Sequence, residues 1–157
     1  MSLEKLKLLT PKSTSLERSG GRGKDALSWE DIAAALSKAP ALTSLYARVC
    51  YGYEHSSIEK LEYKIFHQLV ENQNIQDHLV RLSTLKKLVR LAVIEQAFGR
   101  QFPVKDTRMP ADKIRILNLK NPSMWYRKYA DVYAEVQNVF SALEREAFTT
   151  LKYNLSD

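Results

Sequence analysis

Eight lysines and arginines gather between Arg100 and Lys128, where only two aspartates oppose them. This basic segment carries a net charge of +6, which equals the formal charge of the whole 157-residue chain. Ammonium and guanidinium groups neutralise phosphates, and arginine can also donate two parallel hydrogen bonds to the edge of a guanine. The residue types and their clustering therefore indicate binding to a polyanion, and most directly to nucleic acid.

Six cations of the basic segment and three on the preceding helix are the candidate DNA contacts. Arg108, Lys113 and Arg115 are expected where a helix could address a groove, whereas Arg127 and Lys128 are expected at the phosphate backbone. For the three earlier cations an ordinary solvated helix face is an equally good interpretation. The full candidate set is Arg108, Lys113, Arg115, Lys120, Arg127, Lys128, Lys86, Lys87 and Arg90.

Residues that could support catalysis or metal binding lack the spacing which those chemistries need. The three histidines show no HxxxH or HxxE ligand pattern, so no metal site is expected. Cys50 is the single cysteine, which excludes an intramolecular disulfide and is typical of a small core residue. Acidic residues such as Glu59 and Glu62 lie close to lysines, which indicates charge pairing on a helix surface. We therefore expect no catalytic residues, no cofactor and no enzymatic activity.

The local sequence around the basic segment predicts two helices that meet at a turn. Pro110 fits the first turn of a helix over about 109–117, where its missing N–H costs nothing. The run 118–122 then breaks this helix, since asparagine tolerates turn geometry and the residue before a proline avoids the α region. A second helix is expected over about 122–151. Two basic helices joined by a tight turn resemble a helix-turn-helix DNA reader.

Apolar residues recur at helical spacing through the chain from residue 28 onwards. Helices are expected to begin at Ser28, after Pro40, at Ser56 or Ser57, and at Asp77, with a polar interruption over 71–76. The last helix carries a heptad seam suited to packing along a neighbouring helix or along its own copy. The seam consists of Tyr129, Tyr133, Val136, Phe140, Leu143 and Ala147.

No stretch shows the alternating pattern of a β-strand, so the predicted fold is all-α. We expect a small helical bundle with a basic helix-turn-helix-like portion and a long C-terminal helix. Residues 1–27 combine few apolar residues with Ser, Thr and Gly and are expected to form a flexible arm, followed by a single helical domain over 28–157. No apolar run reaches the ~18 residues of a membrane span, and the charged N-terminus does not resemble a signal peptide. The expected location is therefore the cytoplasm, without membrane contact.

Short motifs along most of the chain, and above all inside the basic segment, form a recognisable pattern. They are Leu3-Glu4, Pro11-Lys12-Ser13, Leu27-Ser28, Asp31, Ala33-Ala34, Arg108-Met109-Pro110-Ala111, Pro122, Trp125 and Arg127. Together they resemble the late-gene antitermination Q proteins of lambda-type bacteriophages. That family carries an insertion with paired CxxC zinc ligands ahead of its Arg-Met-Pro element. Here nine residues without a cysteine separate Phe98 from Arg108, so the chain resembles a compact form that lacks the zinc-binding insertion.

The resemblance implies a transcription antitermination factor acting in the cytoplasm of a bacterial host. Such a factor binds double-stranded DNA of the phage late promoter and loads onto the bacterial RNA polymerase holoenzyme, which then passes pauses and terminators. A helix-turn-helix repressor or activator is the alternative, because the same basic helices would serve it. A structural interaction protein with incidental charge is a third reading. A dimer formed through the heptad seam would favour a repressor, since repressors commonly match two half-sites, and a monomer would favour the antitermination factor.

Overall fold

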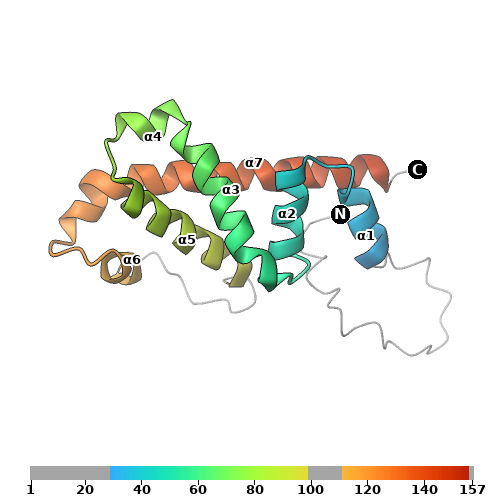
Figure 1. Ribbon diagram of the computed structural model, residues 1–157, viewed down its shortest axis with the longest axis horizontal. Helices are drawn as coiled ribbons and strands as arrows, with labels where there is room; N and C mark the ends of the chain where they lie inside the picture. The colour runs from blue at the N-terminus through green and yellow to red at the C-terminus, as the bar shows by residue number, and fades with distance from the viewer. Residues whose placement is uncertain (1–28, 99–110, 156–157) are drawn as a thin grey trace. The chain divides into compact units, whose positions relative to one another are not determined.

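The computed structural model describes residues 29–98 and 111–155, and within these ranges it contains helices and no strand. The predicted all-α fold is therefore confirmed for this part of the chain, including its long C-terminal helix (Figure 1). Contacts divide the chain into two compact units, one of residues 1–55 with 143–157 and one of residues 56–142. The expected arm over 1–27 lies outside the described residues, and a single domain over 28–157 stays a prediction.

The first unit contains α1 (Trp29–Leu36), α2 (Ala41–Cys50) and the C-terminal part of α7 (Ala130–Asn154). Pro40 separates α1 from α2 as predicted, because it occupies the N-cap position of α2 with φ −50° and cannot continue α1. Two side chains join α2 and its C-cap to α7. The Thr43 hydroxyl donates to Glu146, and the Tyr51 hydroxyl donates to Glu144.

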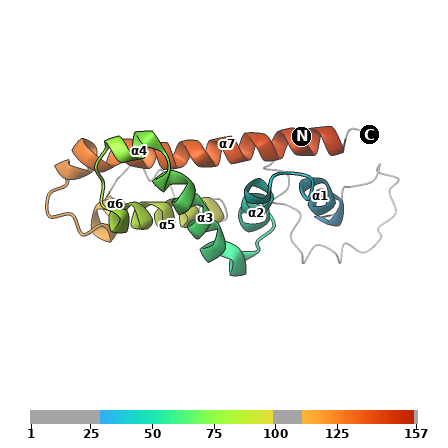
Figure 2. The same cartoon turned by 45° about the horizontal axis from the view of Figure 1, so that its top comes forward.

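The second unit is built on α3 (Ile58–Val70) and α5 (Leu82–Phe98), which pack against each other (Figure 2). The short α4 (Gln73–Asp77) lies between them in the chain, and the 3-10 turn η3 (His55–Ser57) precedes α3. Apolar residues at helical spacing are fully buried on both partners, which fixes the two helices side by side. These residues are Leu61, Ile65 and Leu69 on α3, and Leu85, Leu88, Val89 and Ala92 on α5.

The predicted break after Val70 is confirmed, because α3 ends there with Glu71 as its C-cap. The predicted helix start at Asp77 is wrong, and most of the predicted interruption over 71–76 is helical. Asn72 caps α4 instead, because its side chain accepts a hydrogen bond of 2.9 Å from the Asn74 backbone N–H. Ile75 is buried and anchors this single turn. Leu79 then adopts a left-handed φ of 48°, a conformation that no helix can propagate, so α5 begins only at Leu82.

The last helix of the chain begins with a π-helical turn, η4 (Trp125–Tyr129), and continues as α7. It ends at Asn154, three residues beyond the predicted end at 151. The predicted seam lies on its buried face from Tyr133 onwards, where Val136 and Ala147 are 0% exposed and Tyr133 is 6% exposed; Tyr129, in η4, is half-buried. The seam therefore packs along helices of the same chain. This is the first of the two predicted arrangements, the other being packing along its own copy.

Candidate nucleic-acid interface

At the corner between α6 (Ala111–Ile116) and the last helix, a helix, a turn and a helix follow one another in the predicted order; the predicted start at 109 lies outside the described residues. The Asn118 N–H donates to the Arg115 carbonyl and the Leu119 N–H donates to the Ile114 carbonyl, both at 3.0 Å. With Asn118 at φ 52°, this is a Schellman motif, which ends a helix by satisfying its last carbonyls. The Asn121 side chain then accepts from the Ser123 N–H at 3.0 Å and starts the next helix.

A partly buried cluster of four side chains connects α6 to the two longer helices beside it. We call Glu95, Lys113, Trp125 and Tyr133 the Lys113 cluster. The Lys113 ammonium lies 3.5 Å from a Glu95 oxygen, 4.2 Å from the centre of the Tyr133 ring and 5.7 Å from that of Trp125. The two aromatic rings lie 5.6 Å apart, and the Tyr133 hydroxyl donates to Glu95. A cation over aromatic faces with a carboxylate at its side is a favourable arrangement in a desolvated position.

The structure thus gives Lys113 a different environment from the other predicted DNA contacts that it describes. Its side chain is only 17% exposed, and its charge faces Glu95 and two rings. Trp125 and Tyr133 stand two turns apart on one helix, a spacing that places both rings on one helix face. This spacing was the sequence signal for an aromatic surface that Lys113 could contact. The sequence does not show which cation these rings meet, so the contact with Lys113 was not predicted.

Burial raises the pKa of the Tyr133 hydroxyl well above its ordinary value of 10. The hydrogen bond to Glu95 and the negative charge of that carboxylate raise the pKa further, while a hydrogen bond with Gln137 lowers it. Burial acts in this direction because it disfavours the charged phenolate. Tyr133 therefore stays a hydrogen-bond donor to Glu95 over the whole neutral and mildly alkaline range.

This raised pKa predicts a loss of stability in alkaline solution. Above about pH 10 the unfolded chain releases the Tyr133 proton while the folded chain keeps it, so stability falls by up to about 1.4 kcal/mol per pH unit. Tyr133→Phe lacks this proton, and its unfolding free energy should fall correspondingly less between about pH 9 and pH 11. Urea unfolding of both proteins at each pH measures the difference, and equal slopes would contradict the raised pKa.

Four predicted contacts surround the corner, and all four are exposed. Arg115 lies on α6, Lys120 in the turn, and Arg127 and Lys128 in the π-helical turn η4. The Lys128 ammonium lies 6.0 Å from the centre of the Tyr129 ring, which leaves its outer side open to solvent. The structure therefore brings these four cations to one corner of the unit formed by residues 56–142.

The three predicted contacts on α5 are exposed but do not share one environment. Lys86 and Arg90 stand one turn apart and line a cleft between α3 and α5, whereas Lys87 does not line it. Arg108 lies outside the described residues. Glu62, expected on a charged surface, is only 7% exposed, so the surface interpretation is wrong for this residue: it lies on the face of α3 that turns towards α5.

The described ranges, 29–98 and 111–155, offer neither a metal site nor a membrane-spanning helix. No group of three or more His, Cys, Asp or Glu side chains there could hold a metal ion. No helix among these residues has the length and apolar character needed to cross a membrane.

Comparison of the chain with protein-family models, with curated proteins and with solved structures finds no match. The support for a function therefore comes from the arrangement of the chain's own residues and from the resemblance of its motifs.

Proposed function

We propose that this protein is a phage transcription antitermination factor of the compact Q type. It binds double-stranded DNA of a late promoter, associates with bacterial RNA polymerase holoenzyme and lets transcription pass pauses and terminators. In this proposal α6, the turn after it and the start of the last helix act as a helix-turn-helix-like portion of a small bundle.

The observation that carries the proposal is the exposed group of cations at the corner. Lys120 lies in the turn that follows the Schellman motif at Asn118, and Arg127 and Lys128 lie in η4, which begins with Trp125 of the Lys113 cluster. A rigid support keeps the side chains in place and reduces the ordering cost of binding. Cations held in this way can contact successive phosphates and set the register of a duplex.

The position of the heptad seam supports this proposal over a dimeric repressor. Tyr133, Val136 and Phe140 are buried within the chain. A dimer through this seam would first have to expose them, and exposing a large apolar side chain costs about 1.5–3 kcal/mol. Binding by a monomer is sufficient for a factor that is subsequently held by the polymerase.

Single-round transcription through a strong terminator tests the proposed function. The template carries the promoter directly downstream of this protein's own gene, and the polymerase comes from the bacterial host. We expect read-through that requires both the protein and this promoter. A control promoter should give none. Reduced initiation with unchanged termination would make the protein a repressor, and no effect on either step, with active polymerase, would reject both functions.

A further inference from the structure

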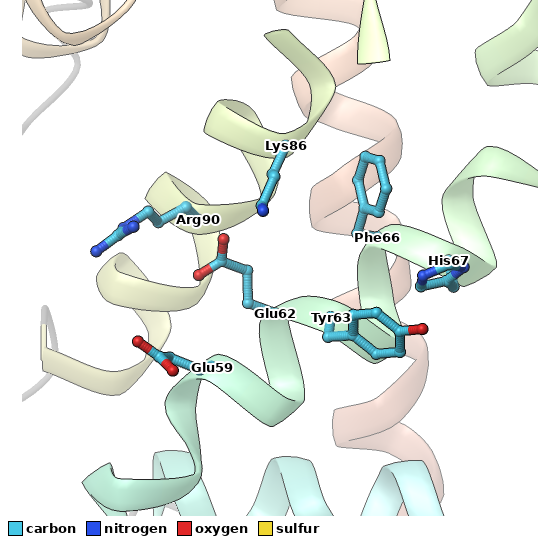
Figure 3. A pocket seen from close by; sticks show the side chains of 7 residues that line it. All are labelled: Glu59, Glu62, Tyr63, Phe66, His67, Lys86 and Arg90. Carbon is cyan, nitrogen blue, oxygen red and sulfur yellow. The ribbon is translucent and has the colours of Figure 1, made fainter. Parts of the chain in front are cut away.

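A cleft of about 370 Å³ lies between α3 and α5, within the unit of residues 56–142 (Figure 3). Its volume falls in the range of small-molecule sites. Carboxylates, aromatic rings and cations all line it, and the α3 side supplies the first two kinds while α5 supplies the third. The lining residues are Glu59, Glu62, Tyr63, Phe66, His67, Lys86 and Arg90.

Glu62 is the feature that distinguishes this cleft from an ordinary charged groove. Its side chain points from α3 towards α5 in Figure 3, and the residue is 7% exposed. Among residues 29–98 and 111–155 no side chain or backbone group lies within hydrogen-bond or ion-pair distance of its carboxylate. Its oxygens are not among the buried polar atoms without a partner in the described ranges, so they remain accessible from the cleft and can accept hydrogen bonds from a ligand. The position is therefore suited to a ligand that brings hydrogen-bond donors.

The other two kinds of side chain define what else the ligand should carry. Phe66 follows Glu62 by one helical turn, and the centre of its ring lies 5.7 Å from that of His67. The rings of Tyr63 and His67 lie 4.2 Å apart and point away from the Glu62 carboxylate in Figure 3. Flat rings of this kind stack on nucleobases. Lys86 and Arg90 are exposed at the α5 side, where they can meet a phosphate.

Guanine is the base whose edge fits an acceptor-only carboxylate. It presents two adjacent donors, N1–H and N2–H₂, which match the two oxygens of one carboxylate. Adenine and cytosine each place an acceptor beside their amino group, and uracil flanks its single N–H with two carbonyls. These three bases would therefore bring an acceptor against the Glu62 oxygens.

We propose that the cleft between α3 and α5 binds a guanine nucleotide. Glu62 accepts hydrogen bonds from N1–H and N2–H₂, Phe66 packs against the base, and Lys86 and Arg90 hold the phosphate. Because N1–H is occupied in a base pair, the ligand is either a free nucleotide or an unpaired guanine in a single strand. The inference rests in part on the proposed nucleic-acid binding, since Lys86 and Arg90 belong to both.

Isothermal titration of the full chain with GMP and AMP tests the inference. We expect GMP to bind at least about tenfold more tightly than AMP, and Glu62→Gln to remove this preference. Glu71→Gln, an exposed carboxylate at the end of α3 that does not line the cleft, is the matched control and should behave as the unmodified protein. Equal binding of GMP and AMP, or tighter binding of free L-arginine than of GMP, would overturn the proposal.

A second variant keeps the test independent of any effect of Glu62 on folding. Lys86 is exposed, so Lys86→Gln should fold normally. GMP should bind the unmodified protein about tenfold more tightly than guanosine, and Lys86→Gln should reduce this ratio towards one. An unchanged ratio would show that Lys86 does not contact the phosphate, and it would contradict the assignment of a nucleotide as the ligand.

Two further comparisons distinguish a free nucleotide from a single strand as the ligand, and a failure of the guanine site from a failure of the proposed function. A single-stranded hexamer with one guanine should outcompete GMP if the ligand is a strand, whereas GMP alone should bind if it is a free nucleotide; both support guanine recognition. The triple variant Lys120→Ala, Arg127→Ala, Lys128→Ala should weaken duplex binding by about 100-fold and keep GMP binding. GMP selectivity, which only Glu62→Gln should lose, therefore tests the guanine site in the cleft. Duplex binding tests the proposed nucleic-acid interface at the corner.

Discussion

Replacing Trp125 with alanine is expected to lower the free energy of unfolding by about 3–5 kcal/mol. Trp125 is 6% exposed and occupies the first position of the π-helical turn η4. Its ring packs at 5.6 Å from that of Tyr133 and lies beside the Lys113 ammonium. Truncation would leave a cavity and remove one face of the Lys113 cluster, so both the transfer term and the cavity term apply.

Urea unfolding followed by circular dichroism measures this loss, and Tyr126→Ala is its control. Tyr126 is the next residue in the same turn but is 63% exposed, so its truncation should change stability by no more than about 0.5 kcal/mol. Similar losses in the two variants would mean that Trp125 does not anchor the corner. If Trp125→Ala kept the free energy of unfolding of the unmodified protein, the Lys113 cluster would not be the rigid support that the proposed function assumes.

Removing three exposed cations at the corner should weaken duplex DNA binding by about 100-fold at low salt. The variant combines Lys120→Ala, Arg127→Ala and Lys128→Ala. Each charge-assisted contact to a phosphate contributes about 1 kcal/mol or more, and each releases close to one counterion. The slope of log affinity against log salt concentration should therefore become shallower by about three units.

Fluorescence anisotropy with a labelled promoter duplex, repeated at several salt concentrations, gives both quantities. The control variant, Lys38→Ala, Lys60→Ala, Lys64→Ala, removes the same charge from exposed positions outside the corner. If loss of net charge alone governed binding, the two triple variants would weaken it equally. A larger loss and a larger change of slope in the corner variant are required for a localised interface.

The sequence by itself determined the helical character of the protein and the break in its basic segment. The spacing of apolar residues on α3 and in the last helix reflects a 3.6-residue repeat, which is a local property that packing then uses. The break at Asn118 is likewise local, because asparagine adopts the left-handed conformation more readily than other residues with a side chain. Pro40 separates α1 from α2 for the equally local reason that it lacks an N–H.

Local signals were insufficient where two capping residues competed. Asn72 and Asp77 are both capable helix starts, and the choice of Asn72 depends on the burial of Ile75 and on the left-handed Leu79. Nothing in the sequence near Asp77 predicts a leucine in that conformation. Tertiary packing overrides propensity at this connection.

Only the tertiary structure decided which charged residues face water and which face each other. Lys113 and Lys120 look alike in the sequence, yet Lys113 lies against Glu95, Trp125 and Tyr133 whereas Lys120 is exposed. Glu62 lies one turn from the exposed Glu59 but is buried beside α5. These differences arise from residues at least 12 positions away in the chain, because burial of a charge depends on which helix packs over it. The sequence located the basic segment, and packing selected the members of it that can meet a ligand.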